Sequence, residues 1–141
     1  MIFMAAFTLI VIAHTIADFF LQTDDQAKGK SSSFRALGSH IIAYTTFLII
    51  TVYPVAFVAA FATWSSTGRI DSIIKIIGLP VLWCIINGCL HFLTDYITSR
   101  ASSYAWSNEN RHDFFCIIGV DQAIHILTLC WTAYAMYAVF F

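Results

Sequence analysis

Four long apolar stretches, separated by three polar segments, run along the chain. The stretches cover about residues 2–21, 37–62, 73–97 and 114–141. A helix that spans a bilayer needs about 20 mostly apolar residues, and each stretch is long enough. The pattern therefore predicts an all-α polytopic membrane protein, in which a bundle of four transmembrane helices forms one domain over residues 1–141.

The first stretch has a feature that a cleaved signal peptide would not normally contain. It lacks a basic start, and its apolar run carries His14 and Asp18. A signal peptide begins with a basic region and continues with an uninterrupted apolar one. We therefore interpret this stretch as a helix of the mature protein.

The composition supports the membrane interpretation and excludes other classes of protein. Of 141 residues, 60% are apolar and 11% are charged, with a formal net charge of −1. Soluble domains are typically about 45–50% apolar and about 25% charged. An ordinary soluble domain, a disordered chain and a nucleic-acid-binding protein are all excluded. The four cysteines form no C-x-x-C pair and indicate helix packing, not a disulfide framework.

The distribution of Lys and Arg predicts which side of the membrane each loop faces. The segments 22–39 and 98–113 hold five basic residues, whereas Arg69 and Lys75 are the only two on the opposite side. The positive-inside rule then places both segments in the cytoplasm and both termini outside. Membrane lipid is the expected partner. A homo-oligomer is left open, because the glycines of the spans form no GxxxG motif that would define a dimer face.

Three pairs of ionisable residues interrupt the apolar stretches. They are His14 with Asp18, His91 with Asp95, and Asp121 with His125. Each pair is spaced i, i+4, which places both side chains on one face of a helix. With four antiparallel spans, all three pairs fall in the half of the bilayer next to the segments 22–39 and 98–113. We therefore expect them to meet in one buried site, near the start of the second helix with His40.

Such residues are costly inside a membrane and need partners or a function. Imidazole with carboxylate suits a divalent metal, zinc first, with manganese or iron as alternatives. We predict His14, His91, Asp121 and His125 as metal ligands, and a two-metal centre is compatible with the number of side chains. Two alternatives stay open: hydrogen-bonded pairs that only hold the helices together, and a proton relay without metal.

The position of the site near one leaflet favours a metal-dependent hydrolase that acts on a lipid or a lipid-linked substrate. A metal ion would activate water, and Asp18 or Asp95 would act as general base. Residues at the mouth of the site would bind a polar headgroup or phosphate; those predicted for this role are Gln22, Asp24, His40 and Arg100.

Two other functions compete with hydrolysis. A proton or divalent-metal transporter would use the same His/Asp pairs, but the outer half of every predicted helix is almost wholly apolar. A path across the membrane needs polar lining at both depths, so this pattern ranks transport second. The third candidate is a non-catalytic membrane scaffold with a structural polar cluster.

At these motifs the sequence resembles a family of small membrane proteins from bacteria and their phages, domain of unknown function 3307. The resemblance rests on three ordered blocks: His14, Asp18, Phe19, Leu21, Gln22, Thr23, Asp24, Ala27 and Lys30 followed by His40 and Tyr44; His91, Phe92, Asp95, Tyr96, Ser99 and Arg100; and Asp121, Gln122 and His125. It covers nearly the whole chain. It implies a bacterial inner-membrane location and one shared site, and it implies no particular chemistry.

Overall fold

The protein is built from helices joined by short connections. The computed structural model describes residues 2–68 and 70–140, and no strand occurs within these ranges. In chain order the elements are α1 (Ile2–Thr15), the π-helical turn η1 (Ile16–Phe20), α2 (Asp24–Gly29), α3 (Phe34–Thr67), α4 (Ile70–Ser107) and α5 (Arg111–Phe140). The all-α prediction is confirmed. Arg69, which entered the prediction of topology, lies outside the described residues.

Three of the described helices are long and apolar enough to cross a membrane. The candidate spans are Phe34–Val58 in α3, Ile77–Ser107 in α4 and Arg111–Met136 in α5. The first predicted span corresponds to Met4–Phe20, a shorter apolar segment made of α1 and η1. At about 1.5 Å per residue it reaches about 25 Å, against roughly 30 Å for the hydrocarbon core of a bilayer. Three spans are therefore supported, and the fourth stays a prediction.

The polar segment predicted over residues 98–113 is mostly helical. The helix α4 continues to Ser107, and α5 begins at Arg111. Hydroxyl groups along this part of α4 donate to the preceding turn: Ser102 Oγ to the Ser99 carbonyl at 3.1 Å and Ser107 Oγ to the Tyr104 carbonyl at 2.9 Å. Loss of hydropathy thus marks the expected edge of the membrane and not the end of the helix.

The polar segment that follows η1 contains the short helix α2. Thr23 and Gln26 form a reciprocal capping box, in which each side chain accepts a hydrogen bond from the other residue's backbone N–H. Gln26 Nε2 also donates to Ser39 Oγ on α3 at 3.2 Å. The cap and this bond hold α2 against the beginning of α3, and so determine where Lys30, directly after α2, is placed.

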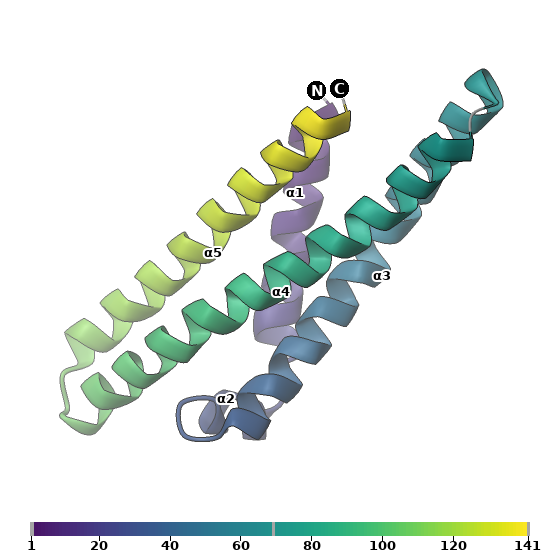
Figure 1. Cartoon of the computed structure of the whole chain (residues 1–141). Coiled ribbons are helices and arrows are strands. Elements are labelled where there is room, and N and C mark those ends of the chain that lie inside the picture. The colour runs from purple at the N-terminus through teal and green to yellow at the C-terminus, as the bar shows by residue number, and fades with distance from the viewer. Residues whose placement is uncertain (1, 69, 141) are drawn as a thin grey trace.

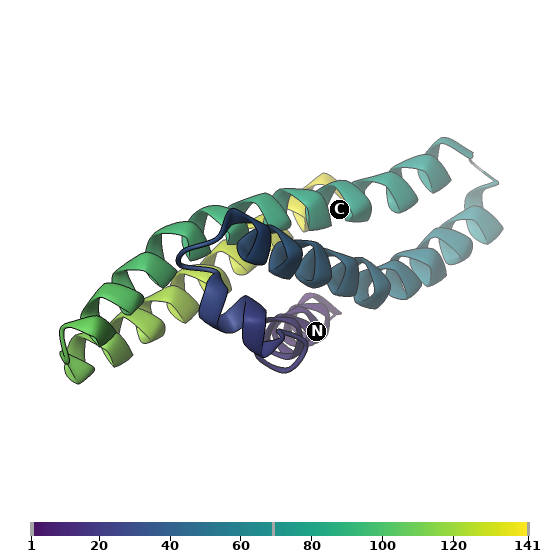
Figure 2. The ribbon, with the colours of Figure 1, turned by 90° about the horizontal axis from the view of Figure 1, so that it is seen from below.

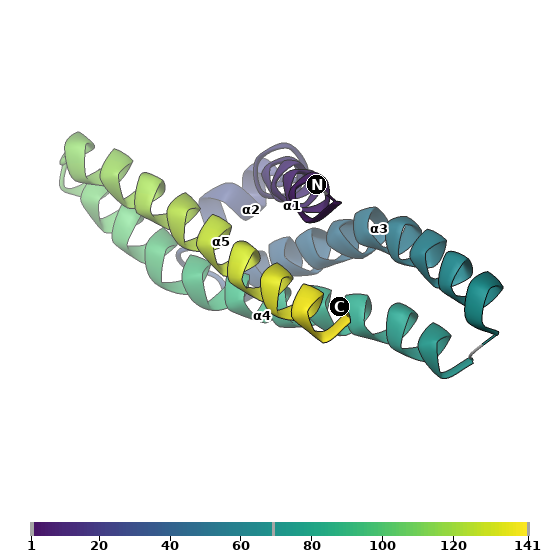
Figure 3. The same ribbon diagram turned by 90° about the horizontal axis from the view of Figure 1, so that it is seen from above.

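The helices form a bundle with two distinct ends. Figure 1 shows both termini at one end, and α2 together with the α4–α5 turn at the other. Viewed from above, α1 lies between α3 and α5, across the bundle from α4 (Figure 3). From below, α2 crosses beside the first turns of α3 (Figure 2). Each of the four long segments therefore runs between the same two ends.

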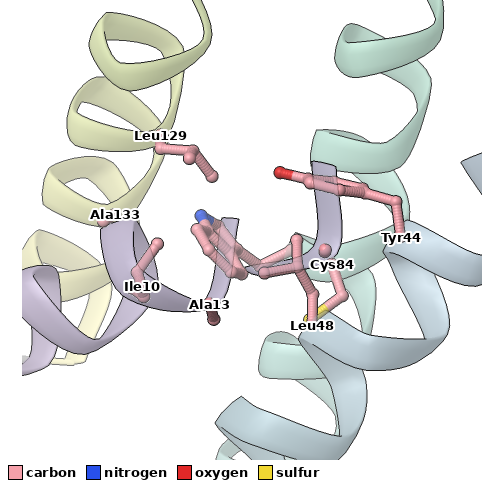
Figure 4. Packing of buried hydrophobic residues seen from close by; sticks show 9 residues of the cluster. Ile10, Ala13, Tyr44, Leu48, Cys84, Leu129 and Ala133 are labelled. Carbon is pink, nitrogen blue, oxygen red and sulfur yellow. The ribbon is translucent and has the colours of Figure 1, made fainter. Parts of the chain in front are cut away.

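The apolar core lies in the half of the bundle nearer the termini. Side chains from α1, α3, α4 and α5 converge there, as Figure 4 shows: the buried cluster is Ile10, Ala13, Ala17, Tyr44, Leu48, Trp83, Cys84, Leu129 and Ala133. Along each helix these residues stand mostly on the termini side of the ionisable ones. The core therefore separates the polar site from the end of the bundle that carries the termini.

The helices α3 and α4 approach each other closely beside the site. A Cβ atom added at Gly88 on α4 would collide with Oγ1 of Thr45 on α3, whereas the same atom at Gly78 would meet nothing within 4 Å. Gly88 therefore permits this close approach, because a side chain there would force Thr45 to change conformation or the two helices to move apart.

Candidate functional site

The buried polar side chains gather in one layer of the bundle. Among the described residues they are His14, Asp18, His40, Asn87, His91, Asp95, Ser99, Asp121 and His125. All six of the residues that form the predicted i, i+4 pairs are in this set, and His40 joins them from α3. The expectation that the three pairs meet in one buried site agrees with this arrangement.

Four side chains direct one ligand atom each at a common point. His40 Nε2 lies 3.1 Å from Asp18 Oδ1, 3.2 Å from His91 Nε2 and 3.5 Å from Asp95 Oδ2. His91 Nε2 lies 3.4 Å from Asp18 Oδ1 and 3.6 Å from Asp95 Oδ2. These four residues, which we call the ligand quartet, come from η1, α3 and α4 and are all buried.

A second group of ligand atoms adjoins the quartet. Asp18, Asp121 and His125 also offer atoms within 4.8 Å of one another. His125 Nε2 lies 3.4 Å from Asp121 Oδ1 and 3.2 Å from Asp95 Oδ1. Asp95 therefore turns one oxygen toward the quartet and the other toward His125. The arrangement is one continuous cluster in which Asp18 and Asp95 face both groups.

Asp18 lies in the π-helical turn η1, which begins two residues after His14. Such a turn is wider than a regular α-helical turn, a distortion that often marks functional sites. Asp18 contacts His40, whereas His14 lies between Tyr44 Oη, 3.3 Å from its Nδ1, and Gln122 Oε1, 3.2 Å from its Nε2. His14 thus borders the cluster without belonging to either group of ligand atoms.

Gln122 and Thr98 orient the carboxylates of the cluster. Gln122 Nε2 donates to Asp18 Oδ2 at 2.8 Å and to Asp121 Oδ2 at 3.0 Å. Thr98 Oγ1 donates a short hydrogen bond to Asp121 Oδ1. Both residues hold oxygen atoms in place without occupying the quartet, which is how outer partners support the ligands of a metal ion.

The imidazole rings are packed against one another and leave some nitrogen atoms without partners. The ring of His91 stacks on Tyr44 and on His125, with centroid distances of 4.0 Å in both cases. The Nδ1 atoms of His40 and His91 are buried with no hydrogen-bond partner among the described residues. Their Nε2 atoms, directed into the quartet, are therefore the ones placed to bind.

Lys30 brings a positive charge to the cluster from the connection after α2. Its Nζ donates to Asp95 Oδ2 at 3.1 Å, and only 19% of its side chain is exposed. Burial alone would lower the pKa of the ammonium group, but Asp95 and Asp18 outweigh burial and raise the pKa of Lys30 above its ordinary value. Lys30 therefore stays charged and neutralises part of the negative charge of the carboxylates.

Comparison with known proteins agrees with the sequence motifs. A family model described as Protein of unknown function (DUF3307) matches residues 6–140. The chain belongs to this family. No curated protein and no solved structure matches it. The three blocks that suggested the family are the ones that supply the buried cluster of this DUF3307 protein.

The four residues predicted at the mouth lie in four different places. His40 belongs to the ligand quartet, and Gln22 lines a cavity beside the cluster. Asp24 is exposed on α2 and pairs with Lys28 at 3.4 Å. Arg100 stacks on the ring of Tyr96, 3.7 Å from its centroid. Neither Asp24 nor Arg100 lines the cavity in this DUF3307 protein.

Sequence reasoning assigned no role to Lys30, Thr98 and Ser99, which all lie beside the cluster. A signal for the last two exists, because they follow Asp95 at i+3 and i+4 and so continue the polar face of α4. They were placed in a loop because hydropathy ends there. The position of Lys30 depends on the capping box of α2, which Thr23 and Gln26 encode.

Proposed function

We propose that this DUF3307 protein is an intramembrane hydrolase that uses a divalent metal ion, zinc first, on a lipid or a lipid-linked substrate. The ligand quartet would hold the ion. The neighbouring group of Asp18, Asp121 and His125 offers a second position that shares Asp18 with the first. Manganese and iron are alternatives with the same kinds of ligand.

The observation that carries this proposal is the geometry of the quartet. Five of the six separations between its ligand atoms run from 3.1 to 3.6 Å, and the sixth, between Asp18 and Asp95, is within 4.8 Å. A tetrahedral zinc ion with ligand atoms about 2.0–2.2 Å away keeps those atoms about 3.3–3.6 Å apart. A hydrogen-bonded network explains the arrangement less well, because two Nε2 atoms at 3.2 Å can share only one proton.

The residues around the quartet supply the rest of a hydrolytic site. A bound metal ion would make water a better nucleophile and polarise the bond to be cleaved. We assign the general base to Asp121, because Asp18 and Asp95 belong to the quartet while Asp121 lines the adjacent cavity. Thr98 and His125 fix the Asp121 carboxylate in position. This assignment differs from the expectation that Asp18 or Asp95 is the base.

The apolar core favours hydrolysis over transport. Ile10, Leu48, Trp83 and Leu129 belong to one buried cluster, on the termini side of the ionisable residues of their helices. An ion or a proton crossing the membrane would have to pass this packed layer, where few polar side chains could replace its water. The site is therefore suited to a substrate that arrives and leaves on one side.

Metal content is the first test. We would purify the protein in detergent and measure bound metals by mass spectrometry in the wild type, in His40→Ala and His91→Ala, and in His112→Ala as the matched control. His112 lies in the first turn of α5 and contacts only Cys116 among the interactions described. We expect about one or two equivalents of zinc, manganese or iron, lost in the first two variants and kept in the third. Well-folded wild type that binds none of these metals would overturn the proposal.

Activity is the second test, on protein loaded with the metal identified in the first. A panel of phospholipids, ceramides and lipid-linked phosphates would be screened for hydrolysis. Asp121→Asn should then lower kcat by about 100-fold or more, the usual contribution of a general base. Proton or metal flux into liposomes with no hydrolysis of any lipid would favour the transporter instead.

A further inference from the structure

A cavity of about 230 Å³ opens beside the cluster, on the side of α2. Part of its lining is polar and includes Gln22, Lys30 and Ser99. Ser99 is only 7% exposed, and its Oγ has no hydrogen-bond partner among the described residues; Oε1 of Gln22 is likewise buried and unpartnered. Buried polar groups nearly always have hydrogen-bond partners, so these two atoms indicate a ligand that forms the missing hydrogen bonds.

Another part of the cavity lining is apolar. This part, which we call the apolar wall, includes Phe19, Phe114 and Ile118 from η1 and α5. Phe19 is 52% exposed, so the apolar wall reaches the outside of the bundle, where lipid chains would lie. A ligand that matches both kinds of lining has a polar head and an apolar tail.

Lys30 connects this cavity to the ligand quartet. It lines the cavity, and its Nζ donates to Asp95 Oδ2. That oxygen is also the ligand atom of Asp95 in the quartet, 3.5 Å from His40 Nε2. A metal ion bound to that oxygen would repel the ammonium group 3.1 Å away from it, because both are positively charged. Lys30 and a metal ion therefore compete for Asp95.

The charges of the cluster determine what else can enter the cavity. With neutral histidines, Asp18, Asp95 and Asp121 against one Lys30 leave a formal charge of −2. This repels anions. One divalent cation would neutralise the cluster, and a second would make its charge positive. Lys30, once displaced from Asp95, would then have no carboxylate partner there.

We propose that Lys30 is a counter-ion that changes partner: it holds Asp95 while the quartet is empty, and once a divalent cation binds it turns to a phosphoryl group in the cavity. The hydroxyl of Ser99 donates to the same group, and the apolar wall receives the chain of an amphiphilic phosphate. This inference rests on the proposed metal site and names the class of ligand that the site takes.

The experiment measures two affinities on detergent-purified protein. Zinc binding is measured by competition with a chelator. Phosphoryl binding is measured by calorimetry with dodecylphosphonate, which cannot be hydrolysed as an ester, and with methylphosphonate, both with and without saturating zinc. The variants are Lys30→Met, Lys30→Arg, Ser99→Ala and, as the matched control, Lys28→Met, whose exposed side chain pairs with Asp24.

We expect Lys30→Met to bind zinc at least about tenfold more tightly than wild type, because a nearby positive charge has been removed. Dodecylphosphonate should bind wild type at least about tenfold more tightly with zinc than without, and Lys30→Met should lose this gain. Lys30→Arg should retain it, and Lys28→Met should match wild type. Ser99→Ala should weaken phosphonate binding with zinc affinity unchanged, so it carries the test if Lys30→Met does not fold.

The outcomes separate this inference from the proposed function. Wild type that binds no zinc overturns both. Zinc binding that is unchanged in Lys30→Met, together with phosphonate binding that is independent of zinc, overturns the role of Lys30 alone and leaves the metal site standing. Equal binding of methylphosphonate and dodecylphosphonate supports the change of partner and assigns it to a soluble phosphate in place of a lipid.

Discussion

The two halves of the bundle are built from the same helices in opposite ways. Toward the termini, Leu48, Trp83 and Leu129 fill the interior by packing. Toward α2, the interior holds ionisable side chains linked by short contacts, such as the one between Asp95 and His125. Burying an apolar side chain carries no cost for removing a charge from water, whereas burying each ionised side chain does. The apolar half must therefore stabilise the bundle. The second half is then free to serve binding, and its placement at one end makes the site one-sided.

The largest effect is expected when a charge is moved into the apolar half. Leu48 is fully buried, and Leu48→Asp should destabilise the protein by about 2.5–3.5 kcal/mol more than Leu48→Ala, the cost of an unpaired charge in a span. Unfolding by SDS titration in mild detergent measures both variants, and Leu48→Ala accounts for the lost packing. Equal losses would mean that water reaches this half, and the argument against a transmembrane path would fail.

The reverse change removes a charge from the polar half. Asp95→Asn leaves the Lys30 ammonium group and three histidines without their shared carboxylate, and we expect a loss of about 3–5 kcal/mol in the free energy of unfolding. The double variant Asp95→Asn/Lys30→Met should be more stable than Asp95→Asn alone, because it removes the uncompensated charge. Asp24→Asn, at an exposed carboxylate, is the control and should stay within about 0.5 kcal/mol of wild type. A double variant no more stable than the single one would show that the pair is not coupled.

Much of this division could be predicted from the sequence. Hydropathy predicted four spans, of which three correspond to helices long and apolar enough to cross a membrane, and the i, i+4 pairs identified six of the buried polar residues. The hydropathy pattern and the i, i+4 spacing both succeed because each depends on one helix at a time. The position of a residue in its helix determines on which face of that helix its side chain lies. The end of α4 could not be predicted this way, since helical hydrogen bonds continue where hydropathy stops.

The partners within the site depend on several helices at once and were harder to predict. His40 was expected at the mouth, yet it lies in the ligand quartet because α3 crosses at the level of His91. His14 was expected as a ligand, but Asp18, in the π-helical turn, belongs to the quartet, whereas His14 lies against Gln122. No periodicity in the sequence marks that turn. Lys30 reaches Asp95 through a short helix that hydropathy does not detect.

A smaller effect is expected at the contact between α3 and α4, beside the boundary of the two halves. Gly88→Ala would place its Cβ against Thr45, and we expect a loss of about 1–3 kcal/mol, the usual cost of overpacking. Gly78→Ala is the matched control on the same helix; it meets nothing and should be neutral or slightly stabilising, because alanine favours helix. Replacing Thr45 by Ala in the Gly88→Ala background should recover part of the loss. Equal stability of the two alanine variants would contradict the close approach.

The smallest effect is a difference in pH dependence between the halves. Because Asp95 and Asp18 outweigh burial and raise the pKa of Lys30, its charge stabilises the folded protein fully below the ordinary lysine value of 10.5, and this stabilisation is lost as pH rises through the higher folded value. The stability difference between wild type and Lys30→Met should therefore be constant from pH 7 to about 10 and shrink above it. Lys28→Met corrects for the general effect of losing a lysine, and the loss caused by Leu48→Ala should be the same at every pH, since no ionisable group is involved. A Lys30→Met difference that stays constant to pH 12 would mean that packing of the lysine stem, and not its charge, holds α2 against the site.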